Sequence, residues 1–229
     1  ESNSSAPLFC RRSLPHPRPS IPEKSLELFF GDIHLHSRLS GDLDGEQDEL
    51  YHFARYTAGL DFCAFTENDF HRLIEPMTPA IWEQNRRNAE YFNDPGRFTA
   101  LLGWEYTKHA EPDQNDPVPD SHRCVILDGS IGEVHHYWDE GVLTSSPRTL
   151  CERLRGSRVL LHHHHDFGYD ITNDDMERNI EITSGWWVLM MKQAFVDALH
   201  RLLREGTKLG LFGSSDNHER NPGLGGALV

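Results

Sequence analysis

The residues best suited to chemistry in this chain are histidines and carboxylates that recur at fixed spacings. His34 and His36 are separated by one residue, and so are Asp216 and His218. Residues i and i+2 of a strand point to the same side, so each pair presents two polar side chains to one face. Imidazole nitrogens combined with carboxylate oxygens suit Zn, Mn or Fe better than Ca or Mg. The chain has 15 histidines among 229 residues, and histidine is the commonest metal ligand. We therefore predict a metal site, in which Glu105 could bridge two ions.

Four consecutive histidines occupy residues 162–165, after an apolar segment that ends at Leu161. A purification tag normally lies at a terminus, whereas this run lies between a strand-like segment and a turn-like one. We therefore interpret it as part of the fold. If Leu161 points away from the interior, His162 and His164 point inward, and His163 and His165 point outward. A bulge would exchange the two pairs.

The elements that must position these residues alternate along the chain. We expect strands at 26–36, 61–69, 97–107, 122–129, 158–165, 179–186 and 208–218, and helices at 45–60, 78–92, 146–156 and 191–206. Seven strands interleaved with helices predict a parallel sheet, either open or closed into a barrel. Parallel α/β barrels build their active sites at the carboxyl ends of the strands. Most of the polar residues of interest fall at those ends or within those strands: His34, His36, Glu67, Asn68, Asp69, Glu105, His162–His165, Glu181, Asp216 and His218.

The chain divides into an arm and one domain. Residues 1–25 contain five prolines and little apolar periodicity, so we predict a flexible arm there. Residues 26–229 are predicted to form a single metal-dependent hydrolase domain. The sequence ends at GLGGALV, which resembles the middle of a domain, so we expect the natural chain to continue.

The net charge and the hydropathy of the chain limit the kinds of molecule that we expect it to bind. Lys and Arg total 22, Asp and Glu total 36, and the formal net charge is −14. A surface this acidic repels nucleic-acid phosphates, which argues against general nucleic-acid binding. A small phosphorylated substrate remains compatible, because bound metal ions reverse the sign of the local field. No run of 18 apolar residues and no signal peptide is visible, so we expect no membrane association and a cytoplasmic location.

Several motifs, in order, resemble those of the PHP superfamily (polymerase and histidinol phosphatase). The segment GDIHLHSRLSGD at 31–42 resembles its first motif, and DFCAFTEND at 61–69 occupies the place of its second. GWE at 103–105, HRCVIL, the histidine run, IEITSG and GSSDNHERNPG resemble the later motifs. The match spans residues 29–226, and the DUF3604 group is the most similar. The resemblance implies a distorted (β/α)7 TIM-like barrel of the PHP type, which would hold two to three Zn, Mn or Fe ions and hydrolyse phosphate esters.

The same resemblance implies ligands for each ion. It assigns the first metal to His34, His36, Glu105 and Asp216. The second would be held by Glu105, His122 and one histidine of the run, for which we choose His164. The third would be held by Asp42, Asn68 and His218. The chain departs from the family at Thr66-Glu67-Asn68, where Thr-Asp-His is usual. An amide is a poorer ligand than imidazole for these metals, although Glu67 or Asp69 could compensate.

The expected mechanism is attack on phosphorus by a metal-activated hydroxide at a site bridged by Glu105. Arg38 or Arg220 would neutralise the phosphoryl oxygens, and His218 would protonate the leaving group. A surface salt bridge is the alternative for each arginine. Two other functions remain open: an amidohydrolase-type barrel that cleaves C–N or C–O bonds, and a non-catalytic metal-binding domain, which the Glu67-Asn68 departure favours.

Overall fold

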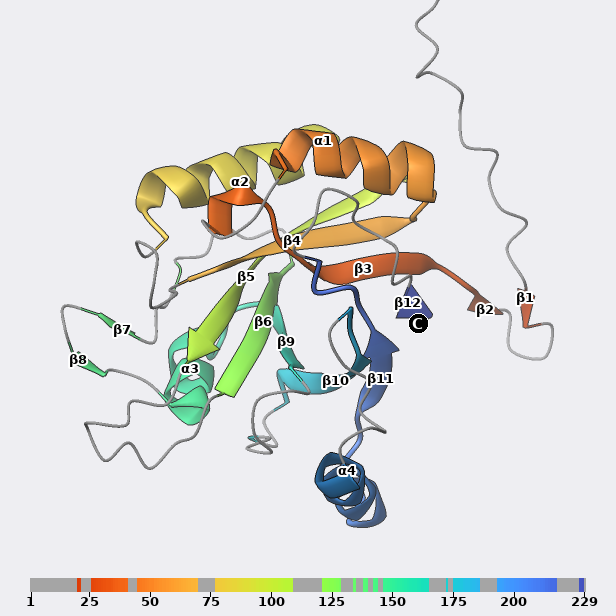
Figure 1. Cartoon of the computed structure of the whole chain (residues 1–229). Coiled ribbons are helices and arrows are strands. Elements are labelled where there is room, and N and C mark those ends of the chain that lie inside the picture. Colours follow the sequence, from red (N-terminus) through yellow and green to blue (C-terminus); the bar gives the residue numbers. More distant parts are fainter. Residues whose placement is uncertain are drawn as a thin grey trace, which may run out of the picture.

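One strongly curved sheet carries the polar residues singled out above (Figure 1). In this computed structural model its strand order is β11-β10-β9-β6-β5-β4-β3-β12. The strands are β3 (Phe30–Leu35), β4 (Phe62–Asn68), β5 (Thr99–Lys108), β6 (Ser121–Leu127), β9 (Val159–His163), β10 (Glu177–Thr183), β11 (Gly210–Gly213) and β12 (Ala227–Leu228). Each of the seven strands expected from the sequence is confirmed.

The structure describes residues 20–21, 26–40, 45–69, 77–108, 121–128, 134, 138–139, 142–143, 146–164, 172, 175–185, 193–217 and 227–228. Three of the predicted site residues, Asp42, His218 and Arg220, lie outside these ranges, as does His165.

The two ends of the sheet meet beside the carboxyl end of β3. The Asp216 N–H, just beyond β11, donates to the His34 carbonyl at 2.9 Å. Leu35 and Asn217 form a parallel bridge at the same place, and β12 pairs antiparallel with the amino end of β3. The protein is therefore a mixed α/β structure whose seven main strands form a nearly closed, barrel-shaped sheet.

Strand β6 runs antiparallel to both of its neighbours, β5 and β9. The other pairs among the seven main strands are parallel, so the predicted parallel sheet is wrong at this strand. Apolar periodicity reports which face is buried but carries no information on direction. Residues 109–120, which join β5 to β6, are rich in acidic residues and proline, whereas a parallel pair usually requires a crossover helix. The reversal puts His122, at the start of β6, opposite Thr107 near the end of β5.

Within the described residues, four α-helices pack outside the sheet, and all four were expected from the sequence. They are α1 (Gln47–His52), α2 (Pro79–Phe92), α3 (Pro147–Leu154) and α4 (Gln193–Arg204). Helix α1 continues as a π-helical segment, Phe53–Ala58, which ends at Gly59 in the left-handed region (φ 72°). Thr78 and Ser146 accept hydrogen bonds from the backbone N–H groups of Ile81 and Thr149 and so cap α2 and α3. In Figure 1, α1 and α2 lie over β3 and β4, and α4 lies beside β11.

Alternation along the strands separates two apolar layers. Ala64, Cys124, Ile126 and Phe212 pack together inside the barrel. Leu161 instead packs on the outer side, in a cluster that includes residues of α3. The outer cluster under α1 and α2 includes Tyr51, Phe65 and Phe92, whose rings are in contact. Because Leu161 faces outward, its neighbours on the same strand face the interior.

Four short strands among the described residues were not expected, whereas β2 falls within the expected strand 26–36. β1 (Ser20–Ile21) pairs with β2 (Leu26–Glu27), β7 (Trp138–Asp139) pairs with β8 (Val142–Leu143), and β12 joins the main sheet. Each has two residues, which is too short to produce a period in the sequence. β1 lies within the segment predicted as a flexible arm. Among the described residues, no helix is long and apolar enough to cross a membrane.

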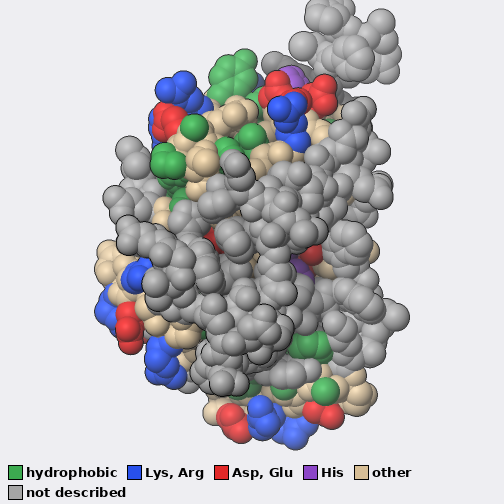
Figure 2. Space-filling model, turned by 60° about the vertical axis from the view of Figure 1, so that its left-hand side comes forward, with side chains coloured by type: hydrophobic (Ala, Val, Ile, Leu, Met, Phe, Trp, Pro, Cys, Tyr) green, Lys and Arg blue, Asp and Glu red, His purple; other side chains and the backbone are tan. Residues whose placement is uncertain are grey.

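Charged side chains of both signs are mixed on the described part of the face shown in Figure 2. Helix α2 illustrates the pattern, because Arg86 and Arg87 both form ion pairs with Glu83. Exposed pairs of this kind contribute roughly 0–1 kcal/mol each. Burial of the two apolar layers, rather than surface charge, therefore stabilises the sheet.

Replacing Leu161 with alanine tests whether this outer layer holds β9 in place. Leu161 is fully buried, so the cavity left behind should lower the free energy of unfolding by about 2–5 kcal/mol. Leu203 of α4 is 39% exposed, and Leu203→Ala is the matched control, with a cost below about 1 kcal/mol. Urea denaturation measures both. Equal losses in the two variants would contradict the placement of Leu161.

Candidate metal centre

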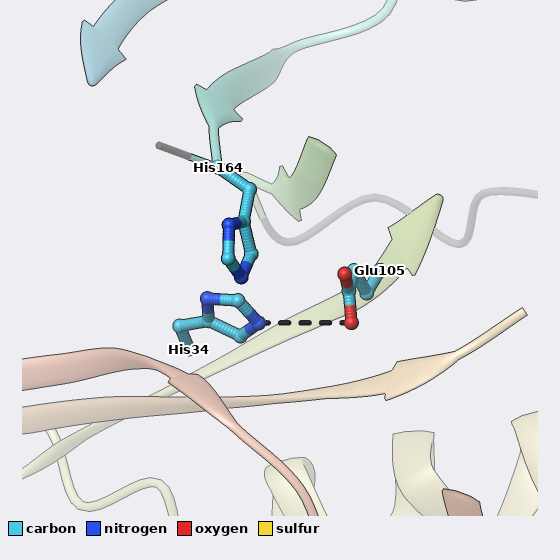
Figure 3. Close-up of side chains that lie close together, drawn as sticks. All are labelled: His34, Glu105 and His164. Atoms are coloured by element: carbon cyan, nitrogen blue, oxygen red, sulfur yellow. Dashed lines mark ion pairs between the residues drawn. The ribbon is translucent and has the colours of Figure 1, made fainter. Parts of the chain in front are cut away.

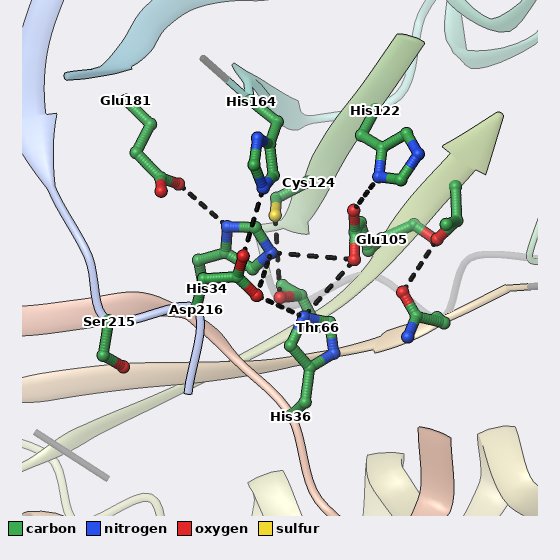
Figure 4. Close-up of polar contacts among 12 residues, drawn as sticks. His34, His36, Thr66, Glu105, His122, Cys124, His164, Glu181, Ser215 and Asp216 are labelled. Carbon is green, nitrogen blue, oxygen red and sulfur yellow. Dashed lines mark hydrogen bonds and ion pairs between the residues drawn. The ribbon is translucent and has the colours of Figure 1, made fainter. Parts of the chain in front are cut away.

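The polar side chains converge at one end of the barrel, as the close-up in Figure 4 shows. They come from the carboxyl ends of β3, β5 and β9, from β10, from the segment after β11, and from the amino end of β6. All are buried, and the set comprises His34, His36, Glu105, His122, His162, His164, Glu181 and Asp216. The strand-end pattern in the sequence therefore reflects a real cluster, with the single reversed strand contributing His122.

Four of these side chains surround one point. The His34 Nε2 atom lies 3.6 Å from Glu105 Oε2 and 3.5 Å from Asp216 Oδ1. The corresponding distances from His36 Nε2 are 3.3 and 3.2 Å. Ligands on a tetrahedral zinc ion, with bonds of 2.0–2.1 Å, lie about 3.4 Å apart. The four His–carboxylate distances are close to this value, and His34, His36 and Asp216 offer ligand atoms that all lie within 4.8 Å of one another.

Glu181 orients His34 for this role. Its Oε2 atom lies 2.8 Å from His34 Nδ1, and because a carboxylate only accepts hydrogen bonds, Nδ1 carries the hydrogen. When the ring is neutral, its lone pair is then on Nε2, which is buried and has no hydrogen-bond partner among the described residues. A carboxylate on the second nitrogen is the usual support for a metal-binding histidine. The unsatisfied nitrogen is therefore an observation that a metal ion would explain.

The second oxygens of both carboxylates face two further histidines. Glu105 Oε1 lies 2.7 Å from His122 Nδ1, and Asp216 Oδ2 lies 3.2 Å from His164 Nε2. His34, Glu105 and His164, drawn in Figure 3, each offer a ligand atom within 4.8 Å of the others. Glu105 and Asp216 thus each lie between two sets of imidazoles, an arrangement that suits a two-metal site.

A third group, His34, His162 and Glu181, also has ligand atoms within 4.8 Å. Here Glu181 Oε2 lies 2.8 Å from His34 and 3.0 Å from His162 Nε2. These are hydrogen-bond lengths, shorter than the edges of a tetrahedral metal site. We interpret this group as the support of His34 rather than as a separate metal site.

Asp216 is held in place by its backbone. Its φ of 46° is in the left-handed region, which aspartate tolerates better than most residues but at some energetic cost. The N–H bond to His34 fixes one side. On the other side, Asp32 accepts hydrogen bonds from the backbone N–H groups of Ser215 and His34. Buried Asp32, whose pKa burial raises to about 6, therefore joins β3 to the segment that carries Asp216.

The charges of the cluster are coupled. Burial by itself raises the pKa of Glu105, but the hydrogen bond from His122 and the charges of His122 and His34 hold that pKa well below its usual range. Burial likewise raises the pKa of Asp216, and interactions with His34, His164 and His36 lower it further than burial raises it. The carboxylates are therefore ionised and balanced by imidazolium. A divalent cation would take over this role and release protons on binding.

The third predicted ligand set is only partly described. The Asn68 amide oxygen accepts a hydrogen bond of 2.9 Å from the Thr107 hydroxyl. Glu67, one step along β4, faces away from the cluster and accepts from Ser37, Ser40 and Gln47. The structure therefore does not bring Glu67 to the place where it could compensate for Asn68. Asp69 accepts from the Thr107 backbone N–H.

Other predicted site residues have mixed outcomes. Arg38, expected near the phosphoryl oxygens, is largely exposed and forms an ion pair with Glu46, which is the alternative weighed for it. The inward orientation of His162 and His164 is confirmed by the outward packing of Leu161. Reasoning from the sequence missed Asp32, although it lies two residues before His34 and so shares its period.

Comparisons with known proteins agree with part of the sequence resemblance. Residues 53–149 match the family described as "Protein of unknown function (DUF3604)", which confirms the resemblance to that group over this range. A solved two-domain protein from Bacteroides vulgatus, containing a predicted PHP-like metal-dependent phosphoesterase, is similar at 17% identity and a TM-score of 0.49. The match covers 84% of this chain and 52% of that one, so this chain spans about half its length. No curated protein matches.

Zinc should stabilise the metal-free protein, because the ion would bind only the folded cluster. At a free concentration 100 times the dissociation constant, the gain is about 2.7 kcal/mol, measurable as a rise in Tm. His36→Gln removes one of the four donors and should lose most of the gain. His52 lies on the exposed side of α1, so His52→Gln should keep all of it. An equal gain in both variants would show that zinc binds elsewhere.

Proposed function

We propose that this chain is a metal-dependent hydrolase that cleaves phosphate esters with two to three divalent ions, Zn, Mn or Fe. One observation carries the proposal. Glu105 and Asp216 each direct one oxygen toward His34 and His36 and place the other beside His122 or His164. Paired carboxylates shared between two sets of imidazoles are the donors that a two-metal hydrolytic site needs.

The distances between these side chains support the ligand assignment that the resemblance implies. His34, His36, Glu105 and Asp216 would hold the first ion. Glu105, His122 and His164 would hold the second. When bound, ions at such a site supply Lewis acidity, which activates water near neutral pH and neutralises phosphoryl oxygens. The third ion would be held by Asn68, Asp42 and His218. Of these three residues, Asp42 and His218 lie outside the described ranges.

The residues of the chain would contribute position and environment. Glu181 fixes the ring of His34. Cys124, Ile126 and Phe212 fill the barrel beneath the cluster, so water and substrate would reach it from the carboxyl-end side. With a net charge of −14, the protein repels an anionic ester except where bound cations reverse the local field. This favours substrate binding directly at the ions.

One structural observation bears on each of the two alternative functions, the non-catalytic metal-binding domain and the amidohydrolase-type barrel. A non-catalytic metal-binding domain is favoured by Asn68, because an amide is a poorer ligand than imidazole and its oxygen accepts from the Thr107 hydroxyl. An amidohydrolase-type barrel consists of parallel strands only, whereas β6 is antiparallel to both neighbours. The non-catalytic domain would bind metal without hydrolysing a substrate. The antiparallel strand β6 argues against the amidohydrolase-type barrel.

Glu105→Gln tests the proposal, because an amide cannot share two anionic oxygens between ions. Metal per chain, measured by elemental analysis without chelators, should fall from two or more equivalents to one or fewer. Hydrolysis of p-nitrophenyl phosphate and of its bis-ester should fall by about 100-fold or more. Glu83→Gln on α2, which removes a surface carboxylate, is the matched control and should retain both.

The outcomes separate the possibilities. A Glu105→Gln protein with full metal and full turnover would exclude bridging by Glu105. Wild-type protein that carries metal but hydrolyses neither ester would favour the non-catalytic domain. Wild-type protein that takes up no metal would overturn the proposed function.

A further inference from the structure

Behind the metal centre, the carboxylate of Glu67 is completely buried and receives four hydrogen bonds. Its Oε1 atom accepts from the Ser37 hydroxyl at 2.5 Å and from Gln47 at 2.8 Å. Its Oε2 atom accepts from the Ser40 hydroxyl at 2.5 Å and from the Ser37 backbone N–H at 3.0 Å. Gln47 and the Ser37 backbone N–H can only donate, and a carboxylate in the ionised form accepts from all four groups.

Ser40 connects this carboxylate to the metal centre. Its hydroxyl oxygen lies 2.5 Å from Glu67 Oε2, 3.0 Å from the Asn68 backbone nitrogen and 3.2 Å from His36 Nδ1. A serine hydroxyl has one hydrogen to donate. That hydrogen goes to Glu67, which has none to give in return. The Ser40 oxygen must therefore accept from both of its other neighbours, so the hydrogen between Ser40 and His36 belongs to His36.

We propose that Ser40, anchored by Glu67, fixes His36 in the tautomer with hydrogen on Nδ1 and the lone pair on Nε2. The Nε2 atom is the one that lies 3.3 Å from Glu105 and 3.2 Å from Asp216. Only this tautomer can offer Nε2 to a metal ion, so the consequence for metal binding rests on the proposed function. Ser40 and Glu67 are positioning residues, because they act through His36.

The inference assigns a role to the departure from the family motif. His34 is oriented directly by a buried carboxylate, Glu181, and His36 is oriented by a second one through a hydroxyl. Glu67 is fixed in turn by Gln47, whose amide nitrogen also donates to Asn85 of α2 at 2.9 Å. The support of His36 therefore extends from the barrel to the two helices that cover it.

The chain contains a matched control for Ser40. Ser37 and Ser40 each donate to Glu67 at 2.5 Å, and each accepts from one backbone N–H, that of Leu39 or of Asn68. Only Ser40 also contacts the ring of His36. Ser37→Ala and Ser40→Ala thus remove nearly equal hydrogen bonding, and they differ in the contact that the proposal invokes.

The test uses the full chain labelled with ¹⁵N-histidine. In metal-free protein, at a pH where the ring is neutral, the ¹⁵N shifts of His36 report which nitrogen carries the hydrogen. Wild type and Ser37→Ala should show hydrogen on Nδ1, whereas Ser40→Ala should populate the Nε2–H form. Zinc affinity, measured by competition with a chromophoric chelator, should fall about 10–100-fold in Ser40→Ala. In Ser37→Ala it should stay at the wild-type value.

Each result is decisive for one of the two proposals. A neutral His36 in wild type with hydrogen on Nε2 overturns the inference, and this measurement needs no variant to fold. Equal zinc affinities in the two serine variants also overturn it, while leaving the proposed function intact. Failure of wild type to bind zinc overturns the proposed function, and the tautomer measurement on metal-free protein then still decides the role of Ser40.

Discussion

The arrangement of the barrel depends on keeping Glu105 and Asp216 ionised where little water reaches them. An isolated carboxylate in such a place loses several kcal/mol of solvation, so donors and positive charge must surround it. The structure supplies His34, His36 and His164 around Asp216, and His122 in addition beside Glu105. A divalent ion would satisfy both carboxylates more completely than shared protons can.

The alternation of side chains along the strands places these histidines and carboxylates on the inner face of the barrel. The inward residues Ala64, Cys124 and Phe212 build the apolar floor, and the inward positions further along the same strands are polar. The two-residue alternation of inward and outward side chains therefore determines both the packed interior and the site above it. The reversal of β6 fits this scheme, because a strand that enters the sheet at the site end places its first inward residue, His122, at the level where the parallel strands place their last.

The sequence was informative where the spacing of polar or apolar residues along one segment is enough to determine which face they occupy or which element they form. The spacing of His34 and His36 predicted that both rings share a face, and the apolar runs predicted the seven strands and four helices. It did not reveal the direction of β6, because direction depends on pairing between distant segments. It also did not reveal that Asp32 joins β3 to Ser215. That contact forms across the closure of the barrel, so the period that places Asp32 on the same face as His34 does not identify its partner.

The segment Thr66-Glu67-Asn68 shows why a motif cannot be interpreted one residue at a time. Consecutive residues of a strand face opposite sides, so a change at two adjacent positions acts in two environments. Asn68 faces the cluster and bonds to Thr107, which weakens the case for a third ion. Glu67 faces α1 and, through Ser40, contacts His36, which we propose as a ligand of the first ion. The departure thus removes a donor from one part of the centre while the neighbouring residue strengthens another. The buried carboxylate behind His36 is therefore a support that the proposed first site would use to orient this ring.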